Sequence, residues 1–351
     1  MTVIDLAPGM TRGLAVPAAQ AQVDAALARH LGAEAATVVH GLAGAVLVAV
    51  ASCLAREHRG AVDRLPEGGG QIVLQKAHCV DLGCRLTQII ATAGAVAVEI
   101  GAVDETALYQ LEDALAEEAS GALFVVGAGA GAGLDLPSFL FAAHARQVPI
   151  IAVAPGRPDW TGLLDAGVDL LVMDAATALG GPGAGIVAGR ADLVRAVRLQ
   201  QLGIGGLVRP APSLLRELAA ALDTDRAAIL EDRRDRVAAR LGGIAGLTVE
   251  PADNGLALIV DAKAAGYSAR DLAVALRGGE PAVLLDDREA RAGRLGLELA
   301  RSDEAVLEDA LLAILARLEA GVDPAPWPWH AKDRMADDLT RELARPADRP
   351  G

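Results

Sequence analysis

Four short apolar runs decide the fold: QIVLQ at residues 71–75, AVAVEI at 95–100, ALFVV at 122–126 and PIIAVA at 149–154. Each has the length and apolar character of a buried strand. Between them lie longer segments whose apolar residues recur at helical spacing. Alternation of buried strands with helices is typical of a mostly parallel sheet covered on both faces, so the sequence predicts an α/β fold.

The strand–helix rhythm continues on both sides of these runs. Residues 59–70 are polar and rich in Gly, so we expect a loop there. Elsewhere the apolar residues keep strand or helix spacing. Further strands are expected at 36–39, 169–173 and 185–188, and helices at 17–31, 42–56, 81–93, 105–118, 137–146, 160–166 and 192–202.

The pattern changes after Gly203, where longer helices alternate with short strands, as in a small α+β unit. We expect a large domain over residues 1–220 and a small C-terminal domain over 240–320. A tail over 321–351 is rich in Pro, Asp and Arg. In this second half, helices are expected at 211–222, 226–241, 268–277 and 302–318, and strands at 248–249, 256–260 and 282–285.

Charge and hydropathy exclude several classes of protein. The chain of 351 residues has a formal net charge of −14, which argues against a nucleic-acid groove, since that needs an excess of Lys and Arg. Its most apolar run, residues 42–54, is shorter than the roughly 20 residues of a membrane-spanning helix. The first residues lack the basic and apolar regions of a secretory signal. We therefore expect a cytoplasmic protein that binds neither nucleic acid nor membrane.

The three cysteines, Cys53, Cys79 and Cys84, have no framework spacing, so free thiols in a reducing compartment are expected. His78 and Asp81 stand close to two of them in the sequence. The cluster lacks the second ligand pair that a structural metal site needs. We therefore expect no metal.

Several stretches, in order, resemble a known family. They are VIDLAPGMT at residues 3–11, KAHCVDLG at 76–83, AG at 93–94 followed by VEIG at 98–101, GGPGAGIVAGR at 180–190 and LGIG at 202–205. Together they resemble bacterial selenocysteine synthase and its relatives, such as D-glucosaminate-6-phosphate ammonia-lyase, over roughly residues 1–320. The resemblance implies a fold-type-I, aminotransferase-like architecture built to hold pyridoxal phosphate.

The resemblance also implies a missing lysine. The family's lysine forms a Schiff base with the cofactor and lies five residues before a Pro. In the corresponding run, DAATALGGP at residues 174–182, that position holds Thr177. A hydroxyl cannot condense with an aldehyde to form a Schiff base. The chain has only Lys76, Lys263 and Lys332 as substitutes, and Lys76 alone lies near a family motif, at a position where the family has Arg.

Three further departures accompany this one. The family's aspartate that pairs with the pyridinium nitrogen corresponds to Val153, so the electron sink is weakened. A polar loop corresponds to the Gly- and Ala-rich residues 127–133, and a substrate-binding arginine to the apolar residues 283–285. Residues 127–133 also stand where a dinucleotide loop would, but they fit its spacing only partly, and no acidic residue ends the next strand.

Some parts of a cofactor site persist. His78 lies where the family stacks a histidine on the cofactor ring, although a histidine at a strand end is an equal alternative. The run His40-Gly41-Leu42-Ala43 ends a strand and opens a helix, a geometry in which backbone N–H groups hold phosphate. A plain tight turn into a buried helix is the alternative. We treat these five residues as vestigial cofactor-binding candidates.

Three functional hypotheses follow. The first is a degenerate homologue of a pyridoxal-phosphate-dependent transferase or lyase, without bound cofactor, that serves as a non-catalytic partner, regulator or scaffold. The second is an enzyme that works without the Schiff base, through His78 or an anion held at residues 40–43. The third is an active enzyme that uses another lysine, with Lys76 the nearest. We expect a homo-oligomer, at least a dimer, and an active paralogue is a further candidate partner.

Overall fold

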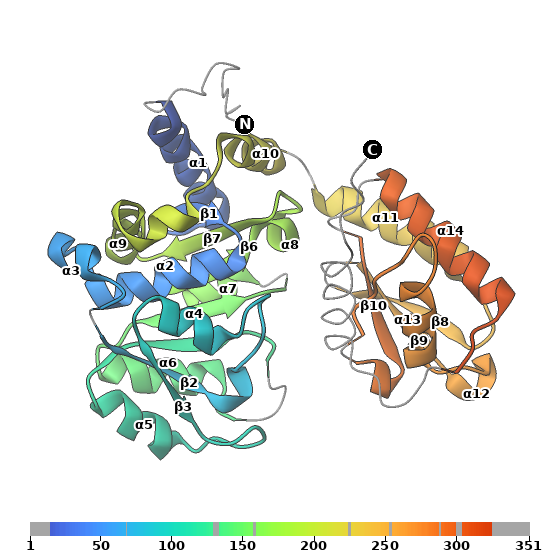
Figure 1. Ribbon diagram of the computed structural model, residues 1–351, viewed down its shortest axis with the longest axis horizontal. Coiled ribbons are helices and arrows are strands. Elements are labelled where there is room, and N and C mark those ends of the chain that lie inside the picture. The colour runs from blue at the N-terminus through green and yellow to red at the C-terminus, as the bar shows by residue number, and fades with distance from the viewer. Residues whose placement is uncertain are drawn as a thin grey trace, which may run out of the picture. The chain divides into compact units, whose positions relative to one another are not determined.

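The computed structural model describes residues 15–67, 69–128, 133–156, 159–223, 226–252, 255–287, 289–299 and 304–324. The chain divides into two compact units, Met1–Ile229 and Leu230–Gly351, and each is treated by itself (Figure 1). The motif at 3–11, most of the Gly-rich loop and the tail beyond 324 lie outside the described residues. The domain limits expected from the sequence stay a prediction.

A seven-stranded sheet forms the middle of the first unit, with strand order β1-β7-β6-β5-β4-β2-β3. Neighbours from β3 across to β6 run parallel, whereas β7 is antiparallel to both β6 and β1. This confirms the predicted α/β class with a mostly parallel sheet. The strands are β1 (Ala35–His40), β2 (Gln71–Gln75), β3 (Val96–Ile100), β4 (Ala119–Val125), β5 (Ile150–Ala154), β6 (Leu170–Asp174) and β7 (Ala184–Gly189).

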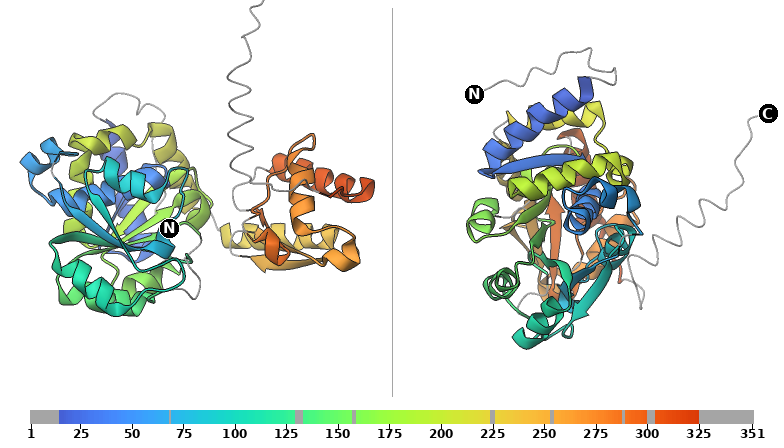
Figure 2. Two further views of the ribbon diagram at one scale, coloured as in Figure 1. Left: turned by 60° about the horizontal axis from the view of Figure 1, so that its bottom comes forward. Right: turned by 90° about the vertical axis from the view of Figure 1, so that its left-hand side faces the viewer.

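Helices cover both faces of this sheet because successive strand residues point to opposite faces. Along β5, Ile150 and Ala152 join one apolar cluster, and Ile151 and Val153 join the other. The layers are visible in two orientations in Figure 2. One face is covered by α2 (Leu42–Ala55), α4 (Leu86–Thr92) and α9 (Ala191–Leu199), the other by α1 (Ala15–Leu31), α5 (Leu108–Ala116), α6 (Leu136–Ala145), α7 (Trp160–Asp165), α8 (Ala175–Leu179) and α10 (Pro212–Leu222).

The second unit is a small α+β body around its own apolar core. Its antiparallel sheet has the order β10-β9-β8. Among the described residues, no helix of either unit is long and apolar enough to cross a membrane. The elements are α11 (Arg226–Leu241), β8 (Leu247–Ala252), β9 (Gly255–Val260), α12 (Ala262–Ala265), α13 (Ala269–Arg277), β10 (Arg294–Glu298) and α14 (Glu304–Ala320).

Two local predictions are wrong. Residues 59–70 are not all loop, because α3 (Arg59–Arg64) forms there and buries Val62. The strand expected at 282–285 is absent from the described structure, and β10 supplies the third strand instead. Val283 and Leu285 are buried while Leu284 is exposed, an alternation typical of a strand. However, the N–H of Val283 donates back to Leu276 O in α13 rather than to a neighbouring strand.

Candidate functional site

The candidate site lies where the carboxyl ends of the parallel strands meet at one edge of the large sheet. Val39 of β1 and Asp174 of β6 both pair with Gly185 of β7. A Cβ added at Gly185 would overlap the carbonyl oxygen of Gly41 and lie 2.6 Å from the Cβ of Ala45. The first turn of α2 therefore rests directly on Gly185, one strand away from Asp174.

Helix α2 presents its amino end at this edge. Gly41 has φ +70°, a conformation that favours glycine, and it ends the strand and turns the chain into the helix. The first backbone hydrogen bond of the helix is donated by the N–H of Ala45 to Gly41 O at 3.1 Å. The N–H groups of the helix residues before Ala45 therefore have no partner within the helix. Leu42 and Ala43 are half-buried here, while His40 is exposed. The four predicted residues are thus together and can hold an anion through backbone N–H groups.

Thr177 and Asp174 form a buried pair beside this turn. Thr177 is 4% exposed and its hydroxyl donates to Asp174 Oδ2 at 3.0 Å. The N–H of Ala176 donates to Asp174 Oδ1 at 3.3 Å, so Asp174 caps the short helix α8. Asp174 was not among the site residues predicted from the sequence. The sequence does contain a signal for this pair. Asp is a common helix-capping residue, and here it ends an apolar strand three positions before Thr177.

His78 lies at the end of β2, in the turn η1 (Lys76–His78), and is 2% exposed. Its Nδ1 accepts the N–H of Val125 at 3.2 Å, and its ring meets the Phe124 ring edge-on, with centroids 4.5 Å apart. Burial lowers the pKa of His78 to about 4, so the ring is neutral at neutral pH. With Nδ1 accepting, the proton is on Nε2, and His78 is a donor rather than a base.

Val153 and the Gly-rich loop supply little polar chemistry in the described structure. Val153 is fully buried in the apolar cluster under α2, with no carboxylate in its place. The loop is anchored by Gln75, which sequence reasoning missed. Gln75 Nε2 donates to Leu134 O at 3.1 Å, and its Oε1 accepts the N–H of Leu134 at 2.7 Å. Residues 129–132 lie outside the described residues.

Lys76 is far from Thr177. It follows β2, which is separated from β6 by β4 and β5, a span of about 14 Å at the usual strand spacing. Its side chain is exposed. Residues 283–285, where the resemblance places a lost arginine, lie in the second unit and are apolar. No group of His, Cys, Asp and Glu able to hold a metal occurs in the described part of the chain.

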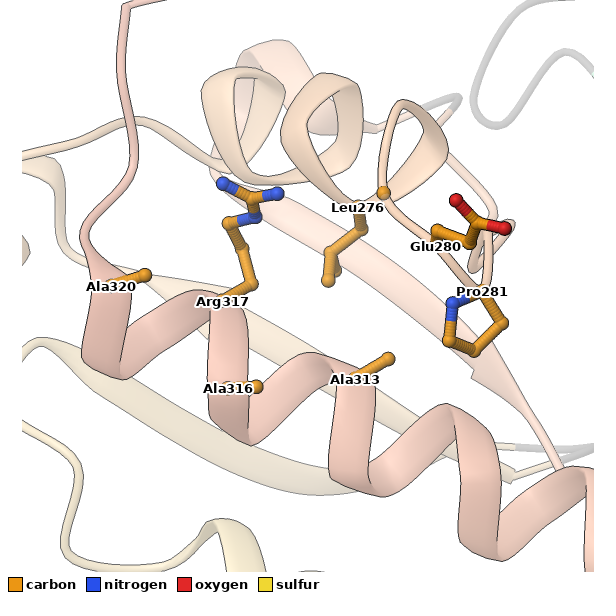
Figure 3. Close-up of a pocket in the computed structure, with 8 residues that line it drawn as sticks. Leu276, Glu280, Pro281, Ala313, Ala316, Arg317 and Ala320 are labelled. Carbon is orange, nitrogen blue, oxygen red and sulfur yellow. The ribbon is translucent and has the colours of Figure 1, made fainter.

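A hollow lies within the small unit, between α13 and α14 (Figure 3). Leu276 and Ala316 contribute to its apolar lining, and the charged side chains on its wall belong to Arg317 and Glu280. It contains none of the residues that the sequence analysis singled out.

The fold and the strand-end site define a class, that of fold-type-I aminotransferase-like proteins. The solved structure of D-glucosaminate-6-phosphate ammonia-lyase matches with a TM-score of 0.71 at 23% identity, over 88% of each chain. The pyridoxal-5'-phosphate-dependent protein YhfS from Escherichia coli matches with a TM-score of 0.54 at 20% identity, over 88% of each chain. At these identities the likeness shows the fold alone.

Sequence relatives then identify the family. A 5'-C-glycyluridine monooxygenase-decarboxylase from Streptomyces is 34% identical over 84% of this chain and 78% of its own length. The D-glucosaminate-6-phosphate ammonia lyase of Salmonella typhimurium is 27% identical over 83% of this chain and 82% of its own. An L-seryl-tRNA(Sec) selenium transferase from Desulfotalea psychrophila is 29% identical over 48% of this chain and 37% of its own. No protein-family model matches. The chain belongs to the family of these enzymes, as the motifs indicated.

The comparisons correct one prediction. We expected no cofactor, because the Schiff-base lysine and the pyridinium partner have no counterpart at Thr177 and Val153. The relatives and structural neighbours are pyridoxal-phosphate enzymes and point to pyridoxal phosphate as the cofactor. The expectation of no cofactor is therefore wrong. The physical reason is that backbone N–H groups alone can hold a phosphate group, and the amino end of α2 presents such groups whatever the side chains at 153 and 177.

Proposed function

We propose that this chain holds pyridoxal phosphate without a covalent bond and is a non-catalytic homologue of the family's enzymes. The observation that carries the proposal is the buried pair of Thr177 and Asp174 beside the amino end of α2. The helix end offers donors for the phosphate group, while the residue aligned with the lysine offers a hydroxyl. When bound, pyridoxal phosphate supplies an electron sink for reactions of amines.

The chain's own residues would position the cofactor rather than activate it. Leu42 and Ala43 would donate backbone N–H groups to the phosphate, and His78 would hold the ends of β2 and β4 together. Val153, aligned with the family's aspartate, would offer the ring nitrogen no carboxylate, and an apolar surrounding would favour the neutral form of that nitrogen. A cofactor with an unprotonated ring and no lysine nearby is a poor catalyst.

We further propose that the chain functions as a homo-oligomer, with an active paralogue as a second candidate partner. Leu202 and Leu207 are 56% and 81% exposed. They lie in the turns η2 (Gln200–Leu202) and η3 (Ile204–Val208), and η3 packs against α2 through Val208 and Gly44. Exposed apolar side chains near the site are the kind of surface that a second subunit covers. Light scattering at micromolar concentration tests this, and a monomer mass would contradict it.

Equilibrium dialysis with pyridoxal phosphate tests the cofactor proposal. We expect saturable binding by the intact chain, and weaker binding by Gly41→Val, which strains the turn at φ +70°. Gly32→Val is the matched control, since Gly32 has a similar φ of +67° but lies in the turn before β1, at the other end of that strand. Failure of the wild-type chain to bind would refute the proposal. Turnover of D-glucosaminate 6-phosphate or 5'-C-glycyluridine would refute the non-catalytic part and support the enzyme hypotheses instead.

A further inference from the structure

We propose that the hollow between α13 and α14 binds a free apolar α-amino acid, such as leucine. The inference goes beyond the proposed function, because it concerns a binding site made by residues of the small unit alone. Residues 283–285, where the resemblance places a substrate-binding arginine, are not among those that line the hollow.

The hollow has the size and lining that suit a small molecule with an aliphatic side chain. Its volume is about 260 Å³, below the roughly 300–1,000 Å³ of sites for drug-sized ligands. At roughly 30 Å³ for each water-sized group, the hollow has room for about nine such groups, and leucine has about nine non-hydrogen atoms. Leu276, Pro281 and Ala316 contribute the apolar part of the wall. A branched aliphatic side chain would therefore leave water for an apolar surface there.

Two opposite charges lie beside this apolar wall. Figure 3 shows Arg317 and Glu280 on either side of Leu276. Neither charged side chain forms an ion pair or a hydrogen bond within the described part of the chain. Arg277, which follows Leu276, is already paired with Asp287 at 3.1 Å. Of the described residues at the hollow, Arg317 is therefore the cation that a ligand carboxylate can bind.

The charges of the hollow match those of a free amino acid at neutral pH. The ligand carboxylate fits the guanidinium of Arg317, whose planar N–H groups bind carboxylates in pairs. The ligand ammonium group fits Glu280. It is also favoured by the carboxyl ends of two helices, because α13 ends at Arg277 and α14 at Ala320. A ligand with only one of these charges would leave one protein group without a partner.

Titration of the intact chain with L-leucine tests the inference, followed by saturation-transfer nuclear magnetic resonance of the ligand. About nine ligand atoms support a Kd on the order of a millimolar. Leucinamide lacks the carboxylate and 4-methylpentanoate lacks the ammonium group, so each should bind about three- to tenfold more weakly than leucine. Glycine lacks the apolar side chain and should show no saturable binding over the same concentrations.

Three variants separate the parts of the site. Arg317→Met should weaken leucine binding about tenfold and leave leucinamide binding almost unchanged, because leucinamide has no carboxylate to lose. Glu280→Gln should weaken leucine binding about threefold and leave 4-methylpentanoate binding almost unchanged. Ala316→Leu places a larger side chain in the hollow and should abolish binding. Arg291→Met, at an exposed arginine outside the lining, is the matched control and should bind leucine like wild type.

The results distinguish a leucine site in this hollow from binding elsewhere. Weaker leucine binding in Arg317→Met but not in Arg291→Met, with leucinamide unaffected, would support the inference. Unchanged leucine binding in Arg317→Met, or equal weakening of leucine and leucinamide, would overturn it. Leucine binding that Ala316→Leu leaves intact would lie at another site and would also overturn it. Absence of saturable leucine binding by the wild-type chain would overturn it without touching the cofactor proposal, which equilibrium dialysis with pyridoxal phosphate tests separately.

Discussion

Replacing Asp24 with Asn should change how the stability of the first unit depends on pH. Asp24 lies on α1, is 5% exposed, and accepts the Thr37 hydroxyl at 3.1 Å on Oδ2. Arg198 is 3.4 Å from the same oxygen, and Oδ1 has no hydrogen-bond partner in the described structure. Burial raises the pKa of Asp24 to about 7, outweighing the opposing effects of Arg198 and Thr37.

The sign follows from proton binding. Between about pH 4 and pH 7 the folded chain keeps the proton on Asp24 that the unfolded chain has lost, so this group's contribution to stability falls as pH rises. The slope is about 1.4 kcal/mol per pH unit between roughly pH 5 and pH 7. Above that range the full cost of ionising Asp24 in the folded state is about 4 kcal/mol, reduced by any relaxation of α1.

Asp24→Asn removes this cost because an amide does not ionise. The variant should gain stability relative to wild type from pH 5 to pH 7 by about 2–3 kcal/mol. Urea unfolding followed by circular dichroism at several pH values measures the difference. Asp63→Asn, at a largely exposed residue paired with Arg59, is the control and should show no such trend. A stability difference between Asp24→Asn and wild type that stays constant from pH 5 to pH 8 would refute the reasoning.

Three further predictions follow from the same contacts. Gly185→Ala should destabilise the first unit by about 1–3 kcal/mol and weaken phosphate binding, because its Cβ overlaps Gly41; unchanged urea unfolding would contradict this. His78→Leu should cost about 1–3 kcal/mol at pH 8 through the unpaired N–H of Val125, and about 1 kcal/mol less at pH 6, because the unfolded wild-type chain protonates this histidine there while the folded chain keeps it neutral; an equal cost at both pH values would contradict the lowered pKa. Gln75→Leu should speed proteolysis after Gly133 relative to Gln71→Leu, since it releases both backbone bonds to Leu134; equal cleavage rates would argue against the anchor.

Secondary-structure elements whose signal lies in a short stretch of sequence could be predicted from the sequence alone. Strands β5, β6 and β7 are buried along their whole length because helices cover both faces of the sheet there, and such apolar runs identified the α/β class. Strand β10, with the sequence RLGLE, was missed because Arg294 and Gly296 break its apolar character, whereas the alternating burial at residues 283–285 imitates a strand. Helix α3 was missed because a glycine-rich segment follows it.

The site was only partly predictable because its contacts join distant residues. His40 to Ala43 form a local turn, and the sequence showed it. The bond from Val125 to His78 spans 47 residues, and those from Gln75 to Leu134 span 59, so no local spacing reveals them. The cofactor prediction failed for a related reason. It weighed the side chains at 153 and 177, whereas the groups available for phosphate at α2 are backbone N–H groups, which any residue supplies.

Borohydride reduction of the chain saturated with pyridoxal phosphate, followed by intact mass measurement, tests the central claim most directly. If the cofactor is held without a covalent bond, dialysis before reduction shows it bound, and reduction leaves the chain at its unmodified mass. Borohydride fixes the cofactor only where an amine has condensed with its aldehyde, and Thr177 offers none. A single reduced adduct on Lys76 or another lysine, formed in proportion to the bound cofactor, would contradict the account.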